Sequence, residues 1–224
     1  MSKPVQPVRS LEARYYTDEA IFADEMSGLF TRTWQVAGHV SRLERPGDYF
    51  AFTIADQNLF AIMGQDGEIR AFYNVCQHRA HELVKDIGNC KVVVCPYHAW
   101  TYELTGELRA GPNIKVVPGF DRTEVCLTEV RVEVFCGFIF VNLDQDARPM
   151  ADWFPGVEAE LRAFVPDIDR LQPVAFVEVP EKCNWKVSVE TYCECYHGAL
   201  NHPTFAPGVV RPAPDAGQPR GRGR

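Results

Sequence analysis

Two short segments of the chain each place a cysteine close to a histidine. One residue stands between Cys76 and His78, two stand between Cys95 and His98, and 16 residues separate the two pairs. Thiolate sulfur and imidazole nitrogen are ligands that proteins use for zinc and for iron–sulfur clusters. Because each pair follows a run of strand-forming residues, we expect both pairs on loops between strands, where the four side chains could hold one metal centre.

Two kinds of metal centre use two thiolates and two imidazoles. In a Rieske [2Fe-2S] centre two cysteines bind one iron and two histidines bind the other. Two loops that each supply one cysteine and one histidine therefore provide all four ligands. In a structural zinc site all four bind one ion, and the first two ligands are usually about two to four residues apart. The single residue between Cys76 and His78 therefore favours the cluster. Buried thiols beside polar loop histidines are the alternative without a metal.

A second group of metal-ligand types lies further along the chain. Glu194 and His197 are three positions apart, which predicts one shared helix face, and His202 follows five positions later. Five positions are about 140° out of phase on a regular α-helix, so both histidines reach one metal only if the helix loosens, and Gly198 is a suitable place. Taken alone, the group is equally typical of a helix end with one structural and one solvated histidine.

Composition limits these interpretations. The 224-residue chain is 46% hydrophobic, which excludes a wholly disordered protein, and its net charge of −7 argues against nucleic-acid binding. No apolar run approaches the roughly 20 residues of a membrane-spanning helix, and the first residues lack the apolar core of a secretory signal. The eight cysteines fit free thiols or metal ligands in a reducing compartment. We expect a cytoplasmic protein with no nucleic-acid or membrane partner.

Patterning divides the chain into four segments. They are an N-terminal helical segment, a β domain, a segment of mixed helix and strand, and a disordered tail, at residues 1–35, 36–144, 145–206 and 207–224. The β domain consists of short strands with turn signals between them, which predicts an antiparallel arrangement. The tail has too few large apolar residues to fold by itself.

Individual elements follow from periodicity and capping. The helices and the strand expected outside the β domain are a helix over 11–34, a helix over 153–164, a strand over 174–179 and a helix starting at Trp185. Asp18 and Asn184 are suitable helix caps. Within the β domain, Asp66 and Gly67 predict a tight hairpin turn with positive φ at both residues.

The residues around the two Cys–His pairs resemble the Rieske-type non-haem iron oxygenases, whose large (alpha) subunits hydroxylate aromatic rings or demethylate amines. The similarity lies in the stretches Asn74-Val75-Cys76-Gln77-His78-Arg79 and Cys95-Pro96-Tyr97-His98-Ala99-Trp100-Thr101-Tyr102. The family often has glycine at the position of Ala99. Rieske proteins of respiratory complexes carry two further loop cysteines that form a disulfide, and His81 and Tyr97 occupy those positions here. The oxygenase branch therefore fits better.

The resemblance implies an α+β fold with an antiparallel β Rieske domain after an N-terminal helix. The beginning of a helix-grip-like α+β catalytic domain would follow. The implied ligands of the [2Fe-2S] cluster are Cys76, His78, Cys95 and His98.

The resemblance also assigns roles to the second group. His197 and His202 are implied ligands of a mononuclear Fe(II), and Glu194 is the implied catalytic carboxylate that connects a cluster histidine of a neighbouring subunit to that iron. The family's third ligand is a carboxylate well over a hundred residues further on, whereas the matched stretch, residues 10–211, is about half of a typical member. Glu190 and Asp215 are conceivable substitutes, and we favour neither.

For a complete enzyme the resemblance implies O₂-dependent hydroxylation of a small substrate. Electrons would come from NAD(P)H through a reductase partner, and alpha subunits of this family form homotrimers. Members that act on quaternary amines often have glutamate at the position of Glu194, which favours N-demethylation of a quaternary ammonium substrate. Alternatives that remain open are a fragment of an aromatic-ring dioxygenase, a truncated protein that only transfers electrons, and a zinc-stabilised binding module.

Overall fold

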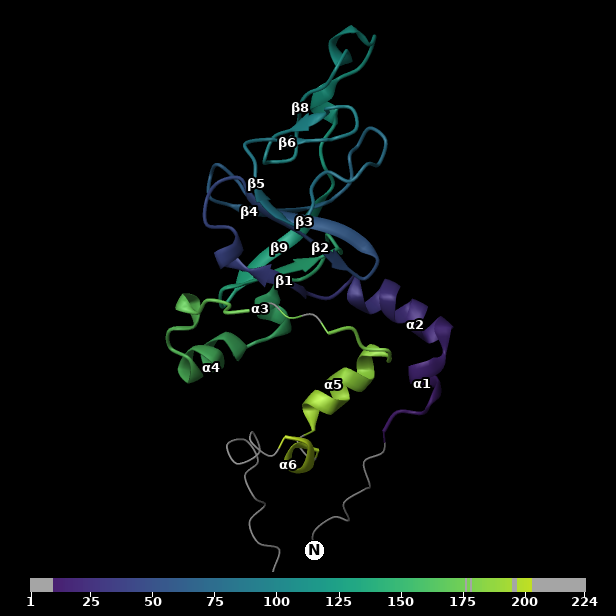
Figure 1. Ribbon diagram of the computed structural model, residues 1–224, viewed down its shortest axis with the longest axis vertical. Helices are drawn as coiled ribbons and strands as arrows, with labels where there is room; N and C mark the ends of the chain where they lie inside the picture. The colour runs from purple at the N-terminus through teal and green to yellow at the C-terminus, as the bar shows by residue number, and fades with distance from the viewer. Residues whose placement is uncertain (1–9, 176, 178, 195–196, 203–224) are drawn as a thin grey trace, which may run out of the picture. The chain divides into compact units, whose positions relative to one another are not determined.

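The computed structural model describes residues 10–175, 177, 179–194 and 197–202, which form an α+β fold as expected (Figure 1). The strands are β1 (Gln35–His39), β2 (Asp48–Ile54), β3 (Gln57–Met63), β4 (Ile69–Tyr73), β5 (Ile87–Asn89), β6 (Val93–Val94), β7 (Thr101–Tyr102), β8 (Leu108–Ala110), β9 (Glu129–Phe135) and β10 (Phe138–Asn142). The helices are α1 (Arg14–Thr17), α2 (Glu19–Glu25), α3 (Met150–Trp153), α4 (Val157–Phe164), α5 (Trp185–Cys193) and α6 (Gly198–Asn201). The chain divides into two units, one formed by its two ends and one by Ala23–Val177.

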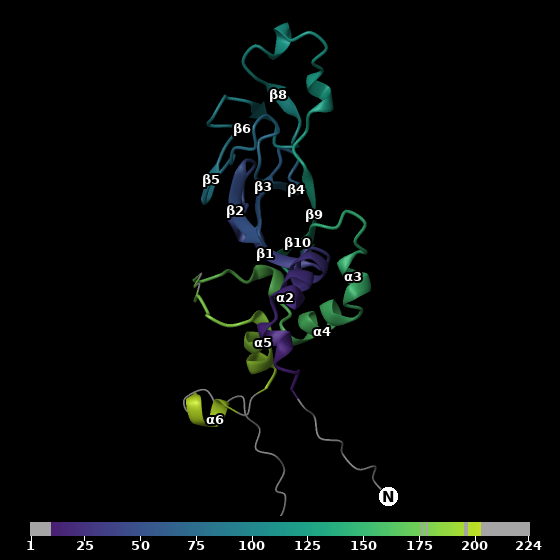
Figure 2. The same ribbon diagram turned by 90° about the vertical axis from the view of Figure 1, so that its right-hand side faces the viewer.

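All ten strands belong to the unit Ala23–Val177 and pair antiparallel, which confirms the expected β architecture. Seven form one sheet in the order β1-β10-β9-β4-β3-β2-β5, and three form a second sheet in the order β6-β7-β8. The smaller sheet lies at one end of the larger one in both views (Figures 1 and 2). Residues 111–125, part of the connection from β8 to β9, lie beyond β8 in Figure 2.

Strand β3 is buried on both faces, and its alternating side chains divide the core in two. Leu59 and Ala61 pack with side chains from β2, β4, β9 and β10, whereas Phe60 and Ile62 pack toward the smaller sheet. All four are fully buried, and burial of a side chain such as Phe60 contributes roughly 1.5–3 kcal/mol. The core on the Phe60 side is the one that also contains cysteines of the predicted metal centre.

The turn predicted at Asp66 and Gly67 joins β3 to β4, but its geometry differs from the prediction. Only Gly67 has a positive φ, of 82°, and the loop is longer, closed by a 2.8 Å hydrogen bond from Gly64 N–H to the Glu68 carbonyl. The tight turn with two positive φ angles occurs instead between β9 and β10, at Cys136 (51°) and its neighbouring glycine (81°). In this five-residue loop Asp66 does not need the left-handed backbone that the predicted two-residue turn would impose on it.

The helix predicted over 11–34 is interrupted. Asp18 separates α1 from α2, and its carboxylate accepts hydrogen bonds from the N–H groups of Ala20 (2.8 Å) and Ile21 (3.3 Å), so the predicted cap is confirmed. The last turn, Met26–Phe30, is π-helical. Asp18 competes for the N–H groups that open α2, and a helix begins anew where such a side chain caps it.

Of the two other predicted helices, one is divided and the other has the predicted start. The segment predicted over 153–164 is split between α3 and α4 by Gly156, whose φ of 82° a right-handed helix cannot accommodate. Helix α5 begins at Trp185 as predicted, where Asn184 accepts a 3.1 Å hydrogen bond from the Lys186 N–H.

The strand predicted over 174–179 is wrong for the residues that the structure describes there. Val174, Val177 and Val179 lie in extended or irregular backbone and are exposed, with relative accessibilities of 102%, 78% and 73%. Valine favours a strand only where a neighbouring strand and a covered face are present, and no described strand pairs with this segment. The predicted disordered tail, 207–224, lies outside the described residues.

Candidate metal centre

The two Cys–His pairs lie on loops, as predicted, and the loops share one backbone arrangement. We call residues 75–82 loop 1 and residues 95–100 loop 2. In loop 1 the Cys76 N–H donates to the His81 carbonyl (2.8 Å), and the Cys76 carbonyl accepts from the Ala80 N–H (2.9 Å). Loop 2 repeats both bonds from Cys95, at 2.8 and 3.0 Å. Each loop also has an alanine in left-handed backbone, Ala80 with φ 53° and Ala99 with φ 55°.

The loops bring the four predicted ligands together. Cys76 and Cys95 are both 2% exposed and belong to the same apolar core, whereas His98 is half-buried and His78 is exposed. The rings of His78 and His98 meet edge to face, with centroids 4.8 Å apart. Two thiols therefore lie inside and two imidazoles lie toward the solvent, the division of ligands that a Rieske cluster requires.

His98 provides a direct test of whether a metal fits. Its Nδ1 is buried and has no hydrogen-bond partner among the described residues. Partial burial lowers the pKa of His98, and its electrostatic interactions with His78, Arg79 and His81 lower it further, which favours the neutral imidazole. A buried ring nitrogen is rarely left unpaired, and a neutral imidazole with a free nitrogen is the form that binds metals. The donor set fits an iron–sulfur cluster.

The sulfur side of the centre has a hydrogen-bond donor. Tyr102 is fully buried, and its hydroxyl lies 3.2 Å from the Cys76 Sγ while accepting a 3.1 Å hydrogen bond from the Gln77 N–H. A cysteine that binds a metal is a thiolate without a proton, so in the metal-bound centre the hydroxyl would be the donor of this contact. Burial raises the pKa of the Cys76 thiol, and the Tyr102 hydrogen bond opposes that rise. Burial also raises the pKa of Tyr102, so the hydroxyl stays protonated and able to donate.

The imidazole side opens onto a hollow of about 700 Å³. Trp100 stacks on His78 with ring centroids 4.8 Å apart and planes 11° from parallel, and Phe120 packs edge-on against Trp100. Ile114, from the segment that joins β8 to β9, also lines the hollow. This aromatic support limits the orientations of the exposed His78 ring.

The second predicted group is also brought together, by a different route from the one expected. Helix α5 ends at Cys193 and Glu194 is extended (φ −117°, ψ 139°), so the prediction that Glu194 and His197 share a helix face is wrong. Their side chains still meet, with 2.5 Å between Glu194 Oε1 and His197 Nδ1. His197 and His202 stand at the two ends of the one-turn helix α6, with ring centroids 5.4 Å apart. The backbone leaves the helix at His202 (φ −128°, ψ 62°), so the phase difference of a continuous helix does not apply to this pair; the expected loosening at Gly198 is not found, because Gly198 begins α6.

A third ligand for this histidine pair is not found in the described part of the chain. No described group of three or more His, Cys, Asp or Glu side chains is arranged to hold a single ion. Glu190 instead accepts a 2.6 Å hydrogen bond from the Tyr16 hydroxyl, which joins α1 to α5 within the unit formed by the chain ends. Asp215 lies outside the described residues.

Comparisons with known proteins match both parts of this arrangement. Residues 33–121 match the family model of the Rieske [2Fe-2S] domain, and residues 168–218 match that of the ring hydroxylating alpha subunit (catalytic domain). The carnitine monooxygenase oxygenase subunit of Acinetobacter baumannii is 38% identical over 196 residues, which are 87% of this chain and 53% of that protein. The chain belongs to the Rieske-type non-haem iron oxygenases.

Other relatives of this Rieske oxygenase chain include subunits with related names. The glycine betaine monooxygenase oxygenase subunit of Pseudomonas aeruginosa is 32% identical over 87% of this chain and 45% of that protein. A crystal structure of a quaternary ammonium Rieske monooxygenase in complex with L-carnitine superposes with a TM-score of 0.84 at 37% identity, over 88% of this chain and 56% of that one. The chain thus spans about half the length of the curated relatives it matches.

Sequence reasoning missed three residues of this Rieske oxygenase chain that support the predicted ligands. Tyr102 and Trp100 stand in the family-like stretch, but their contacts to Cys76 and His78 join residues far apart in sequence. Asn74, in the other stretch, is a buried polar side chain whose partners are described below.

None of the described helices has the length and apolarity that crossing a membrane requires.

Proposed function

We propose that the β domain binds a Rieske [2Fe-2S] cluster on loops 1 and 2. Cys76 and Cys95 would hold the inner iron, and His78 and His98 the outer one. The observation that carries this assignment is the unpartnered buried Nδ1 of His98, whose ring meets the His78 ring edge to face, on loops that also bury two thiols. A zinc ion would need all four side chains around one point, whereas here thiols and imidazoles occupy separate layers.

We further propose that the second group belongs to the mononuclear iron site. His197 and His202 would be two of its ligands, and Glu194 holds the His197 ring in place through Nδ1. An acidic partner of this kind fixes the ring orientation and tautomer of a ligating histidine. When bound, the cluster supplies single electrons and the iron supplies open positions for O₂.

For the whole protein we propose O₂-dependent hydroxylation that leads to N-demethylation of a small quaternary ammonium substrate. The names of the carnitine and glycine betaine monooxygenase subunits support this substrate class, as does glutamate at position 194. An NAD(P)H-dependent reductase and a homotrimeric assembly follow from the family, and the cytoplasm is where NAD(P)H is available. We assign residues 36–144 to the Rieske domain and 145–206 to the start of the catalytic domain.

The proposal is tested by metal analysis of the anaerobically purified chain. We expect about two acid-labile sulfides per chain and about three irons, falling to about two irons in His197→Ala, together with the electron paramagnetic resonance signal of a reduced Rieske cluster. Cys76→Ser should lose sulfide and signal. Two irons per two sulfides, unchanged by His197→Ala, would leave an electron-transfer protein without the mononuclear site. Zinc without sulfide would refute the cluster.

A further inference from the structure

The two ligand loops are closed at their base in different ways. Loop 2 connects β6 to β7, and backbone pairing of Val93 with Tyr102 and of Val94 with Thr101 joins its two ends directly. Loop 1 runs from β4 toward β5, which are not neighbours: β4 lies between β3 and β9, whereas β5 pairs with β2 at the sheet edge. Strand pairing therefore cannot close loop 1.

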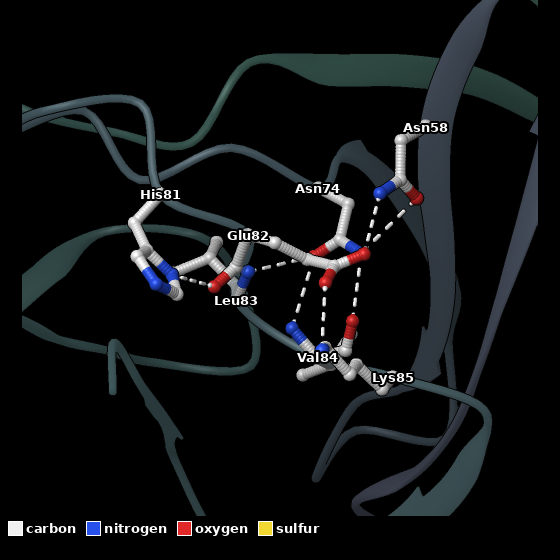
Figure 3. Close-up of polar contacts among 7 residues, drawn as sticks. All are labelled: Asn58, Asn74, His81, Glu82, Leu83, Val84 and Lys85. Carbon is white, nitrogen blue, oxygen red and sulfur yellow. Dashed lines mark hydrogen bonds and ion pairs between the residues drawn. The ribbon is translucent and has the colours of Figure 1, made fainter. Parts of the chain in front are cut away.

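A single buried side chain closes loop 1 instead (Figure 3). Asn74, one residue before the loop, is 1% exposed. Its Oδ1 accepts from the N–H groups of Leu83 and Val84, both at 3.0 Å, and its Nδ2 donates to the Val84 carbonyl at 2.8 Å and to Asn58 Oδ1 at 3.2 Å. An asparagine amide offers two donors and two acceptor positions, and all four are used here.

An outer layer of contacts reinforces the same closure. Asn58, on β3, donates from Nδ2 to Glu82 Oε1 at 2.7 Å, and the Glu82 carbonyl lies 2.6 Å from the His81 Nδ1 (Figure 3). The backbone also participates, because the Asn74 N–H donates to the Asn58 carbonyl at 2.9 Å. The far end of loop 1 is thus tied through Asn74 and Asn58 to β3, an interior strand of the sheet.

We propose that Asn74 is a positioning residue for the metal centre. Its side chain replaces strand pairing at the base of loop 1 and so fixes Cys76 and His78 against the ligands of loop 2. This inference rests on the proposed cluster. Loss of the amide leaves two backbone N–H groups and a carbonyl at the loop base without partners, and loop 1 then opens to recover hydrogen bonds with water. Ligand spacing across the two loops is lost with it.

The test compares Asn74→Ala with Asn142→Ala in the full 224-residue chain. Asn142 is a matched control: it is fully buried at the end of β10, accepts from the Asp144 N–H (3.0 Å) and donates to the Arg32 carbonyl (3.4 Å), all outside both loops. Each variant is measured at the same interval below its own unfolding midpoint. The readouts are the g-values of the reduced cluster and the rate of iron release to a chelator.

We expect Asn74→Ala to release iron about tenfold faster than the control and to shift or broaden the g-values, since the ligand geometry itself has changed. Equal release rates and identical spectra in both variants would overturn the inference. If Asn74→Ala does not fold, Asn58→Ala, at an exposed position, is compared with the control in the same way. A wild-type chain without a Rieske signal would instead refute the proposed function, so the two failures are distinguishable.

Discussion

Replacing Tyr102 by phenylalanine isolates one interaction at the proposed cluster. The substitution removes only the hydroxyl that points at Cys76 Sγ, 3.2 Å away, and leaves the buried ring in the core between the two sheets. Because Tyr102 is fully buried, water cannot take over as donor. The second bond lost is the one from the Gln77 N–H, and Gln77 is exposed, so that group can bond to solvent.

The size of the effect follows from charge. A hydrogen bond to a charged group contributes about 1.5–3 kcal/mol, and the reduced cluster, with one more negative charge, accepts it more strongly than the oxidised one. If the difference is about 1 kcal/mol, the reduction potential changes by about 40 mV, since about 59 mV corresponds to a tenfold change, or about 1.4 kcal/mol, for one electron. The bond stabilises the reduced state, so Tyr102→Phe should lower the potential by about 40 mV.

The assay is a redox titration of the anaerobically prepared chain, followed by the cluster's visible absorption. Tyr73→Phe serves as the control, because it removes a half-buried tyrosine hydroxyl on β4 without touching the Cys76 sulfur contact. A potential in Tyr102→Phe that equals the control value, or rises above it, would refute the hydrogen-bond argument. Iron and sulfide contents equal to wild type are required for the comparison.

Three further predictions concern the fold. Ala99→Gly should raise stability to unfolding by about 0.5–1 kcal/mol in urea titrations, because glycine adopts φ 55° without strain; a loss would contradict this. Gly47→Ala should destabilise far more than Gly67→Ala, since both have φ above 80° but only at Gly47 would a Cβ meet a backbone oxygen, at 2.1 Å; equal losses would be contrary evidence. Arg70 lowers the pKa of Asp66 to about 2 from 3.8, so the ionised Asp66 stabilises the fold fully above pH 3.8 and this contribution is lost as the pH falls toward 2. In Asp66→Asn the free energy of unfolding, measured with urea, should depend less on pH over that window.

Sequence patterning predicted the local features of the molecule and missed those that depend on tertiary context. Short apolar runs separated by turn signals predicted the antiparallel β domain, and the spacing of Cys76 and His78 indicated the metal centre, because scarce residue types in a fixed pattern are informative. The breaks at Gly156 and Glu194 were missed, since each depends on local backbone geometry within an otherwise helical pattern. The three-residue strand β5 was missed because its stability comes from pairing with β2.

The residues that support the site escaped prediction for a related reason. Tyr102 contacts a sulfur 26 positions away, and Asn74 bonds to backbone groups nine and ten positions away, at distances that no helical or strand period relates. An asparagine in a loop-like sequence predicts a turn. Only the sheet order, which separates β4 from β5, shows that the loop needs a side chain to close it.

The burial of the four ligands separates two tasks in building the centre. Cys76 and Cys95 belong to the same apolar core as Phe72 and Leu108, so packing of the two sheets brings the thiols together before any metal is considered. The histidines are not members of that core: they lie toward the solvent side of the loops, where His78 has the stacked Trp100 beside it. Their positions depend on loop closure, by strand pairing in loop 2 and by Asn74 in loop 1. Damage to the core should therefore abolish the fold, whereas damage to a loop base should leave a folded chain with a misplaced imidazole.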